Sequence, residues 1–325
     1  MAVANDLCGI GIIRRWLCVG HAFFYCCLLT LVMANNVFAA DDCLTVYYAE
    51  VPEPYMLIQE KIIQGVIESS KLAVSRHVLT REDQERRDQI LIQSLCKAVL
   101  VIGRAGLNVI PRLPSELPVV AGGVLMSLGG MFEVPVVSLI PDPEALFLRV
   151  RHFAPGVKRV AAIFNPERSA GMIEEAGDVA QKMGLELLLF QAEDKKEALA
   201  QYRKFFSQSQ KGDALWLVYD NVSVDKRVLL PYIMKQAWRK DVVVVSSRPA
   251  HARNGALFSI YADYTRYGGQ LSELLRHCQE GGCGASKVIG VRDVDTAVNI
   301  RTAAHLGLNF DVENDPFINL VFPRD

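Results

Sequence analysis

Residues 214–220 read ALWLVYD, an apolar run that ends at a carboxylate, and residues 242–247 read VVVVSS one predicted helix later. GALFSIY follows at residues 255–261 and ADYTRYGGQ at residues 262–270. Continuous Val and Leu runs that alternate with helices are typical of parallel strands whose sheet is covered on both faces. This stretch therefore predicts a parallel α/β sheet in the second half of the chain.

The same alternation continues on both sides of this stretch. Further strands are predicted at residues 44–50, 75–79, 97–103, 117–123, 134–140, 159–165 and 185–190. Helices are predicted at residues 60–69, 81–95, 169–183 and 195–208. These elements form two blocks, residues 43–140 and 157–246, each βαβαβ in outline. The blocks predict an α/β fold with two doubly wound, Rossmann-like lobes.

Ligands of such sheets bind outside the carboxyl ends of the strands. Three successive strands carry polar or aromatic groups at those ends, and the groups are Tyr219-Asp220-Asn221, Ser246-Ser247-Arg248, Tyr261 and Asp263. Because the carboxyl ends of parallel strands meet at one edge, the sequence predicts a binding cleft there.

Several of these segments resemble the periplasmic substrate-binding proteins of ABC transporters. The nearest group has the type I fold and is typified by tryptophan- and tyrosine-binding members. The matching segments are RVAAIFNPE at residues 159–167, the stretch at residues 214–264, Gly268-x-Gln270, and AVNIRTAAHLGLNF at residues 297–310. The resemblance rests on their order and spacing, and it extends over residues 155–310.

The resemblance implies two lobes that exchange their tail elements across a three-crossover hinge. Lobe one is expected at residues 42–138 plus 248–281, and lobe two at residues 139–247 plus 283–325. It also implies a small-molecule ligand between the lobes and an ABC permease as partner. A monomer is expected.

Strand ends and resemblance together select the candidate ligand-binding residues Tyr48, Arg104, Gly122, Gly123, Asn165, Tyr219, Asp220, Asn221, Arg248, Tyr261 and Asp263. The Asp220 carboxylate can pair with a ligand ammonium, and the Arg248 guanidinium can hold a ligand carboxylate. Each has a structural alternative, because Asp220 can cap the following helix and Arg248 can form a surface ion pair. A tyrosine in this set can equally be a packing residue.

Lobe one departs from the relatives after its third and fourth strands. Gly103-Arg104-Ala105 and Gly122-Gly123 occupy places where relatives carry short polar motifs. The glycines permit close backbone approach to a ligand, but no phosphate-binding fingerprint surrounds them. This departure leaves a second function open, a periplasmic sensor or interaction module that retains the fold with an altered cleft.

The amino terminus predicts export. Arg14-Arg15 precede an apolar stretch at residues 16–33, and Val37-Phe38-Ala39 supplies the small residues of a cleavage site. Together they predict a secretory signal peptide at residues 1–39 and a periplasmic mature chain. A retained membrane anchor is the alternative, because the apolar stretch approaches spanning length.

Removing residues 1–39 leaves 286 residues, 33 basic and 35 acidic, with a net charge of −2. That balance, with no basic runs, argues against nucleic acid as a partner.

Four of the eight cysteines remain in the mature chain. We expect bridges Cys278–Cys283 and Cys43–Cys96, with free thiols as the alternative. Their spacing does not fit a metal site, and no cofactor is expected.

The six scattered histidines include no metal-spaced pair, and no serine stands in a G-x-S-x-G motif. An enzyme needs a nucleophile or an acid–base pair with an orienting partner. We therefore expect a binding protein and not an enzyme.

Overall fold

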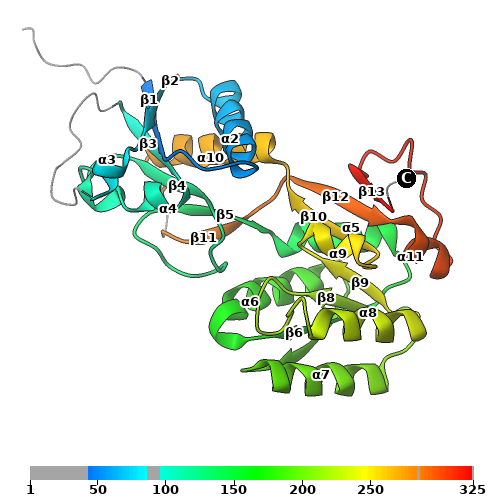
Figure 1. Cartoon of the computed structure of the whole chain (residues 1–325). Helices are drawn as coiled ribbons and strands as arrows, with labels where there is room; N and C mark the ends of the chain where they lie inside the picture. Colours follow the sequence, from blue (N-terminus) through cyan, green and yellow to red (C-terminus); the bar gives the residue numbers. More distant parts are fainter. Residues whose placement is uncertain (1–42, 86–95, 284–285, 324–325) are drawn as a thin grey trace, which may run out of the picture. The chain divides into compact units, whose positions relative to one another are not determined.

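The computed structural model describes residues 43–85, 96–283 and 286–323 (Figure 1). The predicted signal peptide, the rest of the helix expected at residues 81–95 beyond Glu85, and the terminal dipeptide lie outside the described residues. Within them, no helix combines the length and hydropathy needed to cross a membrane.

Two mostly parallel sheets form the fold, as the strand–helix alternation predicts. The first sheet has the strand order β11-β5-β4-β3-β1-β2 and the second has the order β13-β12-β10-β9-β8-β6-β7. The first consists of β1 (Cys43–Tyr48), β2 (Ala73–Val78), β3 (Ala98–Ile102), β4 (Val119–Val124), β5 (Val136–Pro141) and β11 (Val288–Val291). The second consists of β6 (Arg159–Phe164), β7 (Glu186–Gln191), β8 (Ala214–Leu217), β9 (Val243–Ser246), β10 (Phe258–Ala262), β12 (Val294–Asn299) and β13 (Leu320–Phe322).

Helices cover both sheets (Figure 1). The helices that follow strands of the first block are α2 (Tyr55–Ser69), α3 (Arg81–Glu85), α4 (Gly103–Leu107) and the 3-10 turn η1 (Ile110–Arg112). The remaining helices are α5 (Pro143–Phe153), α6 (Pro166–Lys182), α7 (Lys195–Gln208), α8 (Leu229–Arg239), α9 (Pro249–Arg253), α10 (Tyr264–Gln279) and α11 (Ile300–His305). Strands β3, β8 and β9 are buried along their whole length, as expected of strands between two helical layers.

The predicted lobe boundaries divide one strand and misplace two others. The boundary at residues 138–139 falls inside β5, which belongs wholly to the first sheet. β10 pairs in parallel with β9 and antiparallel with β12, so residues 258–262 belong to the second sheet. β11 pairs with β5, so residues 288–291 belong to the first sheet. The chain therefore crosses between the sheets at residues 141–143, 262–264 and 291–294. Local apolar patterns predict a strand but not its partner, and Val288 of β11 pairs with Val136, 152 positions earlier.

The glycine and glutamine of Gly268-x-Gln270 hold lobe one together. A Cβ on Gly268 would lie 2.2 Å from the carbonyl oxygen of Ile62, so only glycine lets α10 approach α2 this closely. The buried Gln270 amide donates to the Gly290 carbonyl at 3.0 Å and accepts from the Arg292 N–H at 3.0 Å. This motif therefore holds α10 against α2 and β11.

Both expected disulfides are present. Cys43 and Cys96 are bridged with their Cα atoms 4.8 Å apart, and Cys278 and Cys283 with theirs 4.1 Å apart. The first bridge joins the starts of two adjacent parallel strands, because β1 pairs directly with β3. The second closes the turn that follows α10.

Candidate functional site

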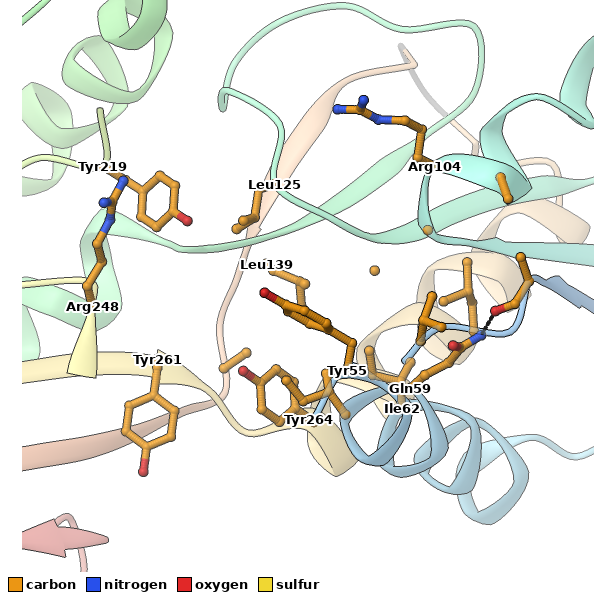
Figure 2. Close-up of a pocket in the computed structure, with 18 of the residues that line it drawn as sticks. Tyr55, Gln59, Ile62, Arg104, Leu125, Leu139, Tyr219, Arg248, Tyr261 and Tyr264 are labelled. Atoms are coloured by element: carbon orange, nitrogen blue, oxygen red, sulfur yellow. Dashed lines mark hydrogen bonds between the residues drawn. The ribbon is translucent and has the colours of Figure 1, made fainter. Parts of the chain in front are cut away.

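A cavity of about 420 Å³ lies at the carboxyl ends of strands from both sheets (Figure 2). Its residues come from four places: the loop after β1 with the first turns of α2, the ends of β3, β4 and β5, the loops after β8 and β9, and the end of β10. They are Ala49, Val51, Tyr55, Ile58, Gln59, Ile62, Ile102, Gly103, Arg104, Ala105, Gly123, Leu125, Leu139, Tyr219, Ser247, Arg248, Pro249, Tyr261, Ala262 and Tyr264.

The first turns of α2 form the apolar wall of the cavity. Ile58 and Ile62 lie one helical turn apart and present the same face. Gln59 is buried, and its side-chain amide donates to the Ala49 carbonyl at 3.1 Å, which fixes its orientation. Tyr55 begins the helix with 63% of its surface exposed, and Figure 2 shows its ring directed toward the cavity.

This wall includes residues that the sequence analysis missed. The helix was expected to begin at residue 60, but α2 begins at Tyr55. The first apolar residues of α2 are exposed, so they do not continue the helical spacing of buried residues. The apolar spacing of Ile62, Ile63 and Val66 therefore predicted only the later turns. Leu125 and Tyr264 also line the cavity. Tyr264 directly follows the predicted Asp263, and its position at a strand end was the available signal.

Three predicted residues form one contact cluster on the second sheet. The Arg248 guanidinium lies over the Tyr219 ring, 4.1 Å from its centroid. The same guanidinium donates from Nη2 to the Asn221 side-chain oxygen at 3.0 Å. Both contacts hold the cation without neutralising it, because a ring face and an amide oxygen carry no formal charge. We call Tyr219, Asn221 and Arg248 the arginine cluster.

Arg104 is the second cation of the cavity. It belongs to α4, directly after β3, and its side chain is exposed. Among the described residues, neither Arg104 nor Arg248 has a carboxylate oxygen within 4.0 Å. None of the described residues that line the cavity is acidic. The cavity therefore combines two cations with a predominantly apolar surface.

Two further tyrosines lie at the junction of β10 and α10. Tyr264 is half-buried, and its pKa is raised first by burial and then by the negative charge of Asp295. Its hydroxyl therefore stays protonated at neutral pH and can donate a hydrogen bond. Tyr261 also lines the cavity, although in Figure 2 its ring points away from the arginine cluster.

Asp220 is at the predicted strand end but does not line the cavity. Its carboxylate is buried and accepts from the Asn165, Val222 and Ser223 backbone N–H groups at 3.1, 2.7 and 2.5 Å. It also accepts from the Ser223 hydroxyl at 2.6 Å. Four donors occupy both oxygens, so the carboxylate stabilises the loop after β8. It does not cap the following helix, because the N-cap of α8 is Val228.

The other predicted residues also lie outside the cavity lining. Asn165 is buried, and its side-chain nitrogen donates to the Ala192 and Glu193 carbonyls at 3.2 and 3.1 Å. Tyr48 is buried and its hydroxyl accepts from Arg76 at 3.1 Å. Asp263 caps α10 by accepting from the N–H groups of Thr265 and Arg266.

The two glycines after β4 have different positions. Gly123 lines the cavity with φ +68°, a conformation that favours glycine, and its N–H donates to the Tyr267 hydroxyl at 2.7 Å. Gly122 faces the protein interior, since a Cβ there would lie 2.6 Å from Leu271 and 2.8 Å from the Tyr267 hydroxyl. Both glycines therefore allow Tyr267 to connect α10 to the end of β4.

Of the candidates, the structure brings five to one cavity: Arg104, Gly123, Tyr219, Arg248 and Tyr261. Asn221 joins them through its contact with Arg248. Among the described residues, no group of three or more His, Cys, Asp or Glu side chains is placed to hold a metal ion. The arrangement offers polar and apolar contacts to a small molecule.

Comparison with protein families gives one match, over residues 139–312, to the model of the ABC transporter substrate binding protein. No curated protein sequence matches significantly. Among solved structures, the chain is similar to the ligand-free, open structure of CD0873, a substrate binding protein with adhesive properties from Clostridium difficile. The identity is 15%, the TM-score is 0.53, and the match covers 86% of this chain and 98% of the other.

It is also similar to an ABC domain in complex with L-Trp from Streptococcus pneumonia, with 17% identity and a TM-score of 0.47. That match covers 86% of this chain and 99% of the other.

Proposed function

Because the chain belongs to the family of ABC transporter substrate-binding proteins, we propose that it captures a small molecule in the cavity and delivers it to an ABC-type membrane permease. The cavity is the observation that carries this proposal. It lies at the strand ends where open α/β sheets bind ligands, and residues of both sheets line it. Its volume of about 420 Å³ is within the range of small-molecule sites.

The proposed cellular setting follows from the sequence. Residues 1–39 act as a signal peptide, and the mature chain works as a monomer in the periplasm. The two bridges, Cys43–Cys96 and Cys278–Cys283, support an oxidising compartment. The activity is binding, with no reaction step.

Binding in such a cavity is expected to draw the two lobes together by hinge motion around the three crossovers. Polar contacts on both sides then supply affinity only in the closed state. A molecule that contacted one lobe alone would bind the open and closed states equally and would not shift the equilibrium toward closure.

Two measurements test the proposal in sequence. Native mass spectrometry of the mature protein, after incubation with a metabolite extract, should detect a bound small molecule. Small-angle scattering with that molecule should then give a smaller radius of gyration than the ligand-free protein. A protein that retains no molecule and keeps its radius would instead be a sensor or interaction module with an altered cleft.

A further inference from the structure

The charged groups that line the cavity are positive. The described part of its lining holds two guanidinium groups, Arg104 and Arg248, and no carboxylate. Four acidic residues are next in sequence to lining residues, and none of them lines the cavity. Asp220 accepts four hydrogen bonds, and Asp263 caps α10. Glu60 pairs with Arg76, and Glu50 is exposed. A ligand ammonium would therefore meet no carboxylate among the described lining residues, and Asp295, behind Tyr264, is outside that lining.

The Arg248 guanidinium is already held in position by neighbouring side chains. Tyr219 supports one face of its guanidinium and Asn221 accepts from Nη2. These contacts leave Nε and Nη1 without a partner in the described part of the chain. A guanidinium that is held in place loses less freedom when a carboxylate binds in the bidentate manner.

The remainder of the lining suits an apolar body. Ile58, Ile62, Ile102, Leu125 and Leu139 contribute aliphatic surface, and the tyrosines contribute aromatic surface. The α2 wall and the arginine cluster stand on different sheets. A ligand with an anionic end at Arg248 and an apolar end at α2 would therefore contact both lobes at once.

We propose that the ligand of this cavity is an apolar or aromatic carboxylate without an amino group, with its carboxylate on Arg248 and its body against the first turns of α2. This inference rests on the proposed solute-binding function and narrows it. It excludes the zwitterionic amino acids, whose ammonium would lie beside two cations and no carboxylate among the described lining residues. Arg104 provides a second, exposed contact for the carboxylate.

The test is a calorimetric titration of the mature protein with matched trios. Each trio keeps one body (phenyl, indole or cyclohexyl) and changes only the charged group: the 3-substituted propionate, the α-amino acid and the 2-substituted ethylamine. The expected result is that at least one propionate binds. Its affinity should exceed that of the matching amino acid by about tenfold or more, and the amine should not bind measurably.

Variants locate the contact. Arg248→Gln should weaken binding of that propionate by about ten- to a hundredfold, since a partner of a desolvated charge pair is lost. Arg104→Gln should weaken it less, because this side chain is exposed. Arg239→Gln, on the exposed face of α8 outside the lining, is the control and should leave the affinity unchanged. Thermal melting of each variant checks that it remains folded.

The opposite results overturn the proposal. An amine or amino acid that binds as tightly as its propionate refutes the charge selection, particularly if Asp295→Asn abolishes that binding. Unchanged affinity in folded Arg248→Gln refutes the assigned contact. If no trio member binds, the native mass spectrum after incubation with the extract decides. A bound carboxylate without an amine supports the ligand class, and any other bound compound refutes it while solute binding stands. If the extract leaves no bound mass either, both proposals fail.

Discussion

A carboxylate at the end of a parallel strand can serve a ligand or the fold, and Asp220 serves the fold. Its two oxygens bind the turn after β8 and the start of α6 together, through Ser223 and Asn165. Arg248, after the neighbouring strand β9, differs from Asp220, because its contacts position it and leave its charge available.

Asp220→Ala should mainly reduce stability. The change leaves the N–H groups of Asn165, Val222 and Ser223 without their acceptor. We therefore expect the free energy of unfolding to fall by about 2–4 kcal/mol. Urea denaturation measures the loss, and titration at a temperature where the variant is folded measures affinity. A variant with unchanged stability and no ligand binding would restore Asp220 to the binding site.

His251 gives stability a defined pH dependence. The side chain is buried on α9, its Nδ1 lies 2.7 Å from the Ser246 hydroxyl, and burial, aided by Arg248, lowers its pKa to about 4. In the unfolded chain a histidine titrates near pH 6.5. Between these values the unfolded state binds more protons, so stability falls as the pH drops from about 6.5 to 4.

We expect His251 to contribute up to about 3 kcal/mol to this fall. Denaturation curves at several pH values, for the wild type and for His251→Gln, isolate the contribution. The difference between the two free energies of unfolding should shrink toward pH 4. Parallel pH profiles would contradict the assignment.

At the scale of elements, α6 depends on one glycine for its contact with the β4–β5 loop. A Cβ on Gly171 would lie 2.4 Å from the Leu128 carbonyl oxygen, and Gly129 approaches the same point. Backbone atoms cannot yield as a flexible side chain would. The helix and the loop from the first sheet therefore fit only with glycine at this position.

Gly171→Ala should lower the free energy of unfolding by about 1–3 kcal/mol through overpacking. Gly177→Ala is a matched control in the same helix, because a Cβ there meets nothing within 4 Å. It should raise stability by about 0.5–1 kcal/mol through helix propensity. Equal effects of the two substitutions in chemical denaturation would refute the contact.

The sequence predicts strands better than it predicts helix starts or strand partners. Apolar runs such as residues 214–217 and 243–246 identify buried strands because burial on both faces leaves no polar alternation. The helix start at Tyr55 was not predicted, because a residue that faces a cavity is not part of the periodic apolar face that packs in the core. Asp220 was ambiguous, since a ligand site and a helix cap use the same residue type at the same place.

For the whole molecule, the two disulfides should contribute unequally. In the loop-entropy picture a bridge stabilises more when it closes a longer loop. Cys43 and Cys96 are separated by 53 positions, and Cys278 and Cys283 by 5. The longer loop joins β1 and β3, two strands of the first sheet.

Replacing Cys43 and Cys96 together by alanine should therefore cost about 4 kcal/mol of unfolding free energy, and replacing Cys278 and Cys283 about 2 kcal/mol. Thiol counting on the denatured, unreduced wild type should find no free cysteine in the mature chain. Equal losses from the two double variants would show that loop length does not determine the stabilisation.

The pairing of β11 with β5 determines when the first lobe can be finished during synthesis. Val288 pairs with Val136, and α10, which covers the same sheet, ends at Gln279. A nascent chain that has reached residue 262 has made five strands of this sheet and neither of those parts. The apolar face that Tyr267 and Leu271 later cover stays open until α10 has been translated. The first sheet to be started is thus completed only after strands β6 to β10 of the second sheet have been made.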